Sequence, residues 1–292
     1  MTARNGPRLL VIGATGTVGR HVVLGLSAKG ARVRAMTRSP ETARMPADVE
    51  VVYGDLTIPE TLDRCLESVD SVFLVWTAPH AAADAALARI TRRAGRIVLL
   101  SAPLKTPHPF FQQPNPARGL ALHVEHLIEH SGVKWTFLRP GMFAANSIDF
   151  WGPQLRTGNT VRWPYLSAPT APIDERDIAA VGVRALTEAG HDRMEYVLTG
   201  PQSLTQREQI LTIGNVIGRS LAVEELSREE ARQAWSATMP VAVADMLMDA
   251  WAAAIGQPAY VTDMVEEIIG TPARTFADWT RDHASAFADS HA

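Results

Sequence analysis

Three glycines near the start of the chain have the spacing of a phosphate-binding turn. They stand at 13, 16 and 19 in the stretch RLLVIGATGTVGR, after a short apolar run and at the opening of an amphipathic helix pattern. Such glycines permit a tight turn, close approach of the backbone to a phosphate, and close packing of helix on strand. The helix N-terminus then offers free N–H groups to a pyrophosphate. We therefore expect a dinucleotide, the alternative being a turn without a ligand, and its contacts to be Gly13, Thr15, Gly16, Thr17, Val18 and Gly19.

The end of the second predicted strand, Ala31 to Thr37, indicates which dinucleotide is bound. A site for NAD usually has an acid here for the ribose 2′-hydroxyl, whereas a site for NADP has a nearby arginine for the 2′-phosphate. This chain has Arg38 and no acid before Glu41, and Arg34 is also basic. We expect NADPH, with NADH as the alternative cofactor. Arg38 is the expected main contact, because a guanidinium pairs with phosphate and stacks on adenine; a solvated surface arginine is the alternative.

Further strands are predicted at 49–53, 72–75, 96–100 and 133–138, with helices between them. This alternation predicts an α/β fold of the Rossmann type, a doubly wound parallel sheet with helices on both faces. Ligands of such sheets lie beyond the carboxyl ends of the strands. Asp55 either meets the adenine edge or caps the next helix. The residues expected at the cofactor from these strand ends are Asp55, Leu56, Trp76, Thr77 and Ser101.

Composition and charge exclude several classes of protein. The net charge of the 292 residues is -3, which predicts no nucleic-acid partner and no anionic membrane. No long uncharged apolar run and no signal peptide is visible, so we expect a cytoplasmic protein. One cysteine excludes an internal disulfide, and the helical spacing of Cys65 with its apolar neighbours predicts core packing. His126 and His130 lack a third ligand, so a solvated helix face is predicted rather than a metal site.

The second half of the chain has a looser pattern. From about Ala144, prolines and aromatic residues replace regular periodicity, and the last 70 or so residues are mostly helical. A helix opened by a threonine cap is predicted at 205–217. The sequence thus predicts a cofactor domain at 1–145 and a smaller, mainly α-helical substrate region at 146–292, with segments near 173–200 returning to the sheet.

Several motifs together resemble the short-chain dehydrogenase/reductase superfamily, in its atypical branch of NmrA-like NAD(P)H-binding proteins. They are GATGTVGR at 13–20, TRSP at 37–40, YGDL at 53–56, the strand into Ser101, HVEHLIEHSGVKWTFLRPGMF at 123–143 and APIDERDIA at 171–179. The resemblance implies hydride transfer from the nicotinamide C4 to a carbonyl or quinone of a small-molecule substrate. It also implies that Pro140, Gly141 and Phe143 lie beside the nicotinamide.

The chain departs from this superfamily at its usual proton donor. Most members have a tyrosine followed four residues later by a lysine, but these positions fall on Ala117 and Ala121 when the helix is registered on Glu125. General acid help contributes about 10²–10⁴ in rate. Positioning of the reactants contributes effective molarities up to about 10⁵–10⁸ M, so a reductase can work without that pair. The proton then comes from water, from Ser101 as the one catalytic candidate, or from a hydroxyl of the substrate.

This combination resembles the ketoreductases of angucyclinone antibiotic pathways, such as the simocyclinone pathway, which implies a ketone on a flat, polycyclic aromatic polyketide. A phenol beside the ketone would stabilise its developing charge. Two alternatives stay open: an NADPH quinone reductase, and a non-catalytic NADP(H) sensor that regulates a partner protein. The aromatic residues expected to hold the substrate, if they are not ordinary core, are Phe110, Phe111, Phe143, Trp163 and Tyr165.

Overall fold

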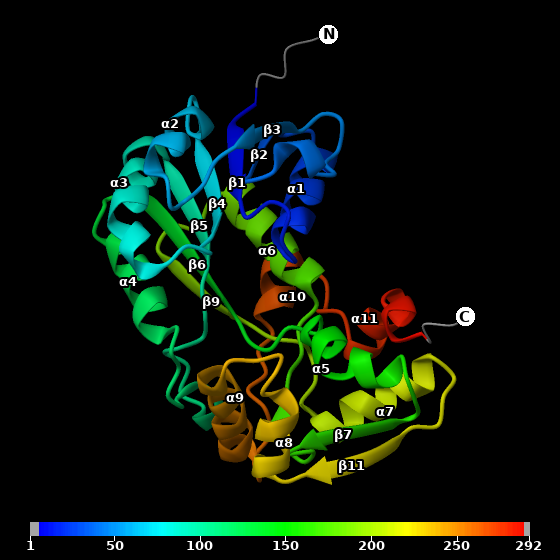
Figure 1. Cartoon of the computed structure of the whole chain (residues 1–292). Helices are drawn as coiled ribbons and strands as arrows, with labels where there is room; N and C mark the ends of the chain where they lie inside the picture. Colours follow the sequence, from blue (N-terminus) through cyan, green and yellow to red (C-terminus); the bar gives the residue numbers. More distant parts are fainter. Residues whose placement is uncertain (1–5, 289–292) are drawn as a thin grey trace. The chain divides into compact units, whose positions relative to one another are not determined.

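The computed structural model describes residues 6–288, and its contacts divide them into two compact units (Figure 1). Unit 1 consists of the described residues up to Ala102 together with Gly119–Pro140 and Glu175–Tyr196. Unit 2 consists of Pro103–Arg118, Gly141–Asp174 and the described residues from Val197 onward. The chain therefore passes between the two units several times.

Unit 1 is organised around a seven-stranded sheet with the strand order β3-β2-β1-β4-β5-β6-β9. The pairings from β3 through β6 are all parallel. Its central strands β1, β4 and β5 are nearly continuous apolar runs, as expected for strands that are buried on both faces. The predicted Rossmann-type fold is confirmed. The strands are β1 (Arg8–Ile12), β2 (Arg32–Thr37), β3 (Glu50–Tyr53), β4 (Ser71–Val75), β5 (Arg96–Leu100), β6 (Lys134–Pro140) and β9 (Met194–Leu198).

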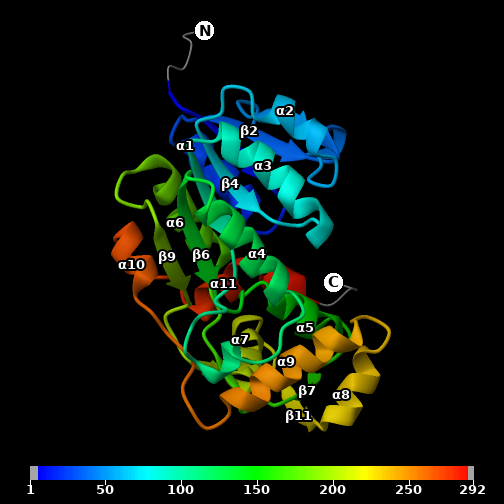
Figure 2. The ribbon, with the colours of Figure 1, turned by 90° about the vertical axis from the view of Figure 1, so that its left-hand side faces the viewer.

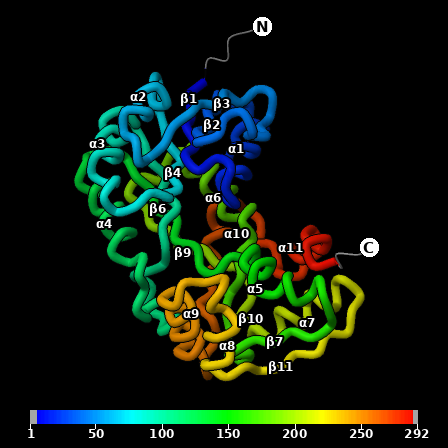
Figure 3. The backbone as a smooth tube through the Cα atoms, viewed as in Figure 1, coloured from blue at the N-terminus to red at the C-terminus, as the bar shows by residue number. Residues whose placement is uncertain are grey.

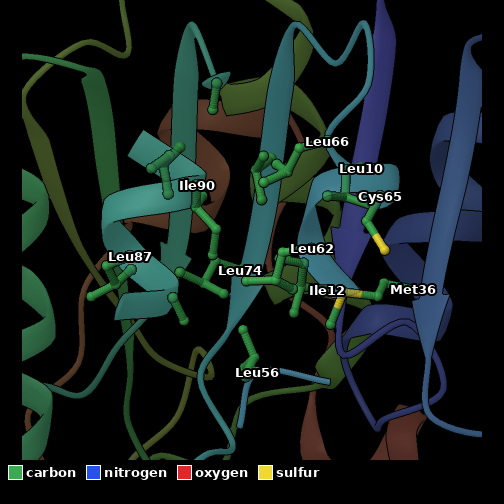
Figure 4. Close-up of a cluster of buried hydrophobic side chains, with 14 of the residues drawn as sticks. Leu10, Ile12, Met36, Leu56, Leu62, Cys65, Leu66, Leu74, Leu87 and Ile90 are labelled. Atoms are coloured by element: carbon green, nitrogen blue, oxygen red, sulfur yellow. The ribbon is translucent and has the colours of Figure 1, made fainter. Parts of the chain in front are cut away.

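Helices cover both faces of this sheet. On one face, Leu10, Ile12 and Leu74 belong to a buried cluster with residues of three helices. Figure 4 labels part of this cluster, with Leu62 and Ile90 among its helical members. Figure 2 shows two of these helices, α3 and α4, over that face. On the other face α1 and α6 pack side by side, far apart in the sequence (Figure 3). The helices are α2 (Leu62–Cys65), α3 (Ala83–Arg93) and α4 (Arg118–Glu129) on the first face, and α1 (Gly19–Ala28) and α6 (Glu175–Thr187) on the second.

Two elements of unit 1 differ in length from the sequence prediction. The helix expected between the strands at 49–53 and 72–75 is a 3₁₀ turn, η2 (Pro59–Thr61), followed by the single turn of α2. It ends early because Ser68 has a φ of 55°, a left-handed conformation that a helix cannot include. Strand β6 runs on to Pro140, past the expected end at Leu138. Proline is tolerated there because the end of a strand needs no further N–H donor.

Unit 2 contains helices and two small ribbons. One ribbon pairs β7 with β11 in parallel, and the other pairs β8 with β10 antiparallel. Helix α7 begins with the predicted threonine cap, a capping box between Thr205 and Glu208. The elements are β7 (Thr160–Pro164), β8 (Pro169–Thr170), β10 (Leu204–Thr205), β11 (Ala222–Leu226), α5 (Asn146–Leu155), α7 (Gln206–Val216), α8 (Arg228–Trp235), α9 (Val241–Ala254), α10 (Met264–Ile269) and α11 (Phe276–Asp282). Unit 2 also has the short 3₁₀ turns η4 (Pro109–Phe111) and η5 (Ala284–Phe287), and unit 1 has η1 (Pro40–Thr42) and η3 (His80–Ala82).

Aromatic side chains fill the core of unit 2. Trp163 packs with its ring centroid 5.7 Å from that of Trp251 and 6.0 Å from that of Trp151. Its indole Nε1 donates to Gln206 Oε1 at 2.7 Å. A buried tryptophan with a satisfied N–H is well suited to a core position.

Cys65 lies in the core of unit 1, as its spacing predicted. Burial raises the pKa of its thiol to about 11. Within residues 6–288, no helix has both the length and the apolar character needed to cross a membrane.

Candidate cofactor and substrate sites

A cavity of about 570 Å³ opens in unit 1 where β1, β2, β3 and β4 end. Its walls come from the loops that follow these strands, the place where parallel sheets bind ligands. Among the residues predicted to contact a cofactor, seven line this cavity: Gly13, Thr15, Gly16, Arg38, Asp55, Leu56 and Thr77.

The glycine turn has the geometry expected of a phosphate-binding loop. Gly13 has a φ of +81°, and a Cβ there would lie 2.8 Å from Cβ of Val75. A Cβ on Gly19 would lie only 2.1 Å from the carbonyl oxygen of Gly13. Both positions therefore require glycine, and together they bring the N-terminus of α1 against the end of β1.

Other predicted cofactor residues lie outside this cavity. Val18 and Gly19 are buried under the turn, and Thr17 is exposed on it without lining the cavity. The indole of Trp76 folds back to donate to the carbonyl oxygen of Ala78 at 2.7 Å. Ser101 and Pro140 also do not line it, and Gly141 and Phe143 belong to unit 2.

The cavity is positively charged at the side that follows β2. Arg38 is joined there by Arg44, and neither forms an ion pair with any of residues 6–288. Hydrogen bonds from the hydroxyl and N–H of Thr57 lower the pKa of Asp55, with a further contribution from the charge of Arg38. Asp55 thus begins a turn and also lines the cavity.

Two basic residues near the cavity differ from the sequence expectation. Arg34 is buried and serves the fold, because it pairs with Glu50 and donates to backbone carbonyls that include Cys65 O at 2.8 Å. Arg44 was missed, although the stretch TRSPETAR places it six residues after Arg38 with one 3₁₀ turn between them. That turn returns Arg44 to the cavity, which spacing alone does not reveal.

Ser101, at the end of β5, belongs to a buried ionic network in unit 1. Its hydroxyl donates to Glu125 Oε1 at 2.6 Å. Arg139 holds the same carboxylate with two N–H groups, at 3.0 and 2.8 Å, and also pairs with Glu195. Burial opposes the charge of Arg139, but the hydrogen bonds that it donates to both carboxylates raise its pKa. With its hydrogen directed to a carboxylate, Ser101 offers lone pairs to a neighbour and is poorly placed to donate a proton.

Two small cavities lie in unit 2, each about 10 Å³, or room for about one water molecule. We call them the His108 cavity and the Trp151 cavity. Of the residues predicted to bind substrate, Phe110 and Phe111 line the first and Phe143 lines the second. Trp163 and Tyr165 line neither of them.

Neither His108 nor Tyr260 was predicted from the sequence; they line the His108 cavity and lie far apart in the chain. The ring of His108 is held on both sides. Its Nδ1 accepts from the N–H of Phe110 at 3.3 Å, and its Nε2 lies 3.1 Å from the carbonyl oxygen of Pro258. Since an N–H only donates and a carbonyl only accepts, the ring carries its hydrogen on Nε2 and is neutral.

Comparison with known proteins gives matches over nearly the whole chain. A family model described as NAD(P)H-binding matches residues 13–189. A (4-alkanoyl-5-oxo-2,5-dihydrofuran-3-yl)methyl phosphate reductase of Streptomyces griseus is 39% identical, over 96% of this chain and 99% of the relative. An NAD(P)H azoreductase of Xenophilus azovorans is 34% identical, over 96% of this chain and 99% of the relative.

Solved structures share the fold. Triphenylmethane reductase of Citrobacter in complex with NADP(H) superposes with a TM-score of 0.80 at 21% identity, covering 94% of this chain and 99% of that one. The NADPH complex of the quinone oxidoreductase QOR2 of Escherichia coli gives 0.78 at 20% identity, with the same coverage.

Proposed function

Because the chain belongs to the NAD(P)H-binding family and is an oxidoreductase, we propose that it transfers a hydride from NADPH to a conjugated, electron-poor acceptor. Family membership supports the resemblance to NmrA-like, atypical short-chain dehydrogenase/reductases. A sensor without activity loses its support, since relatives covering nearly the whole chain are named as reductases.

The cavity of unit 1 supports NADPH as the preferred cofactor. The turn at Gly13 and Gly16 meets the pyrophosphate, and Asp55 meets the adenine. Neither Arg38 nor Arg44 is held in an ion pair among residues 6–288, although Arg38 acts on Asp55 through its charge, so a 2′-phosphate would pair with both guanidinium groups.

We infer the class of acceptor from one observation. Ser101 donates its hydroxyl hydrogen to Glu125, and the chain has no Tyr–Lys pair. Ser101, the one candidate proton donor from the sequence, is then poorly placed to protonate an alkoxide. In a conjugated acceptor the incoming charge is delocalised, so the reaction depends less on a general acid, whose help is worth about 10²–10⁴ in rate. Water completes the protonation.

The similar proteins support this class. Their names describe a dihydrofuran with a 5-oxo group, an azo compound and a quinone, all of which contain conjugated double bonds. The ketone of an aromatic polyketide with a neighbouring phenol, reduced in antibiotic biosynthesis, is the narrower proposal within the same class. Its phenol would supply the hydrogen bond that the protein lacks.

The test is NADPH oxidation with a panel of acceptors. We expect turnover with a naphthoquinone, an azo dye, a 2(5H)-furanone or a 1-hydroxyaryl ketone, and none with cyclohexanone. NADPH deuterated at C4 should pass its label to the carbon product of an active enone or ketone. Reduction of cyclohexanone at a similar rate would overturn the acceptor class, and tight NADPH binding with no turnover on any acceptor would overturn the proposal.

A further inference from the structure

The two cavities of unit 2 share a wall. Met142 and Thr170 line both the His108 cavity and the Trp151 cavity. Thr170 is fixed, because its Oγ1 accepts a hydrogen bond from the buried Gln209 at 2.9 Å. The backbone of Met142 is also fixed, with its carbonyl accepting from the N–H of Ile173. The unbranched, half-buried side chain of Met142 is therefore the adjustable part of the wall.

The Trp151 cavity is lined by two indoles whose N–H groups lack an acceptor. Nε1 of Trp151 and Nε1 of Trp251 have no hydrogen-bond partner among residues 6–288, and each side chain is 1% exposed. Trp163, in the same core, shows the usual situation, since it donates to Gln206. Buried indole N–H groups normally find an acceptor, so two without one at the same cavity point to an oxygen that binds there.

The chemistry of the walls limits what that oxygen belongs to. No lysine or arginine of the described chain lines either cavity, and the ring of His108 is neutral. The Trp151 cavity therefore offers uncharged donors, which suit a carbonyl and do not offset the charge of a phosphate. On the other side of Met142, Phe110 and Phe111 supply ring surfaces in an edge-to-face pair with centroids 5.0 Å apart.

We propose that the two cavities are halves of one substrate site that the side chain of Met142 divides while no substrate is bound. The site takes a flat, uncharged aromatic compound that bears a carbonyl oxygen. The rings displace Met142 and lie toward Phe110 and Phe111, and the oxygen accepts from Trp151 and Trp251. This proposal rests on the reductase function and names the kind of acceptor that unit 2 binds.

The first experiment observes the indole N–H groups directly, in the whole protein without NADPH. Nitrogen-15 NMR resolves the tryptophan Nε1–H signals, and Trp151→Phe and Trp251→Phe assign two of them. Three probes share one ring system: 2-methyl-1,4-naphthoquinone, 2-methylnaphthalene and 1-naphthyl phosphate. We expect the quinone to move both assigned signals downfield and slow their exchange with solvent, with no such change from the other two.

Other outcomes of this experiment overturn the proposal. If the two signals are already protected from solvent exchange in the free protein and do not respond to the quinone, an ordered water alone satisfies the two N–H groups. An equal response to 1-naphthyl phosphate would mean that the site does not discriminate against an anion, contrary to the proposal. A response limited to Trp279, which lines neither cavity, would place the probe elsewhere.

The second experiment measures dissociation constants of the same quinone for matched variants. Trp151→Phe and Trp251→Phe keep an aromatic ring and remove the donor, and each should weaken binding about tenfold, the value expected for one hydrogen bond. Trp279→Phe is the control and should change it less than about twofold. Met142→Ala should tighten binding and Met142→Leu should not, because alanine removes the dividing side chain. Weaker binding by Met142→Ala, in a variant that melts as a single folded species, would contradict the divided site.

Failure of this site and failure of the reductase function are distinguishable. Binding is measured without cofactor, so quinone binding that depends on both indoles, combined with no NADPH oxidation, would refute only the reductase. NADPH-dependent turnover that is unchanged in Trp151→Phe and Trp251→Phe would refute only the site.

Discussion

The cavity of unit 1 and the cavities of unit 2 differ in what lines them. The first is open, about 570 Å³, and built from strand-end loops that carry backbone groups and arginines. The others have about 10 Å³ each, and aromatic rings and smaller side chains line them, without lysine or arginine among the described residues. A cofactor that keeps its shape suits a preformed loop site, whereas acceptors that vary suit side chains that can move. Each prediction below tests one side of this difference.

The largest effect is expected at Gly19. A Cβ there would lie 2.1 Å from the backbone oxygen of Gly13, so Gly19→Ala must displace the turn itself. We expect NADPH affinity, measured by calorimetry, to fall about 100-fold or more, which is about 2.7 kcal/mol. Gly119→Ala is the control, because no atom lies within 4 Å of a Cβ at that helical position. Normal affinity in Gly19→Ala would contradict the phosphate-binding turn.

Arg38→Ala and Arg44→Ala test the preference for NADPH. A charge-assisted hydrogen bond contributes about 1.5–3 kcal/mol, so each change should weaken NADPH about 10–100-fold. NADH affinity should stay nearly constant, since NADH lacks the 2′-phosphate. Arg92→Ala removes the same charge from an exposed position of α3 outside the cavity and should affect neither cofactor. If the affinities for NADPH and NADH fell equally, the contact assigned between these arginines and the 2′-phosphate would be wrong.

Trp163→Phe tests whether the central tryptophan of unit 2 belongs to the core or to the substrate site. The change leaves the buried Gln206 without its donor and should lower the free energy of unfolding by about 1–3 kcal/mol, measured by urea denaturation. KM for the acceptor should change less than twofold or so. A large rise in KM with unchanged stability would support the substrate contact expected from the sequence.

The pH dependence of cofactor binding should come from the ionisation of the 2′-phosphate of the cofactor. The second pKa of a phosphate ester is about 6, so NADP⁺ affinity should fall as pH drops from 8 to 5, by up to about tenfold. Asp55 has a lowered pKa, so its ionised form persists below the usual range and is lost only as pH falls through that lowered value. NAD⁺ affinity should therefore stay flat over this range. A parallel fall for NAD⁺ would show that a protein group titrates instead.

The smallest effect is expected for Ser101→Ala. The hydroxyl hydrogen of Ser101 is directed to Glu125, so its removal should lower kcat less than about tenfold with an acceptor that carries its own phenol. A loss above about 100-fold would make Ser101 the proton donor. The solvent isotope effect on kcat should be the same in both proteins if water supplies the proton.

The sequence predicted part of the cavity of unit 1 and little of the cavities of unit 2, for physical reasons. Apolar strands and the turn at Gly13 are local patterns, and topology places the strand ends together, so Arg38 and Asp55 could be predicted. The return of Arg44 depends on a turn, and the meeting of His108 with Tyr260 depends on tertiary packing. Composition also cannot tell which indole finds an acceptor, so Trp163 and Trp151 look alike in the sequence.

The burial of Cys65 has a consequence for the chemistry proposed. Quinones and enones undergo Michael addition to thiolates, and an enzyme that handles them risks alkylating itself. The only cysteine of this chain lies in the core of unit 1 with a thiol pKa of about 11. At neutral pH about one molecule in 10,000 carries the thiolate, and that sulfur is buried. The protein can therefore meet electrophilic substrates repeatedly without being consumed by them.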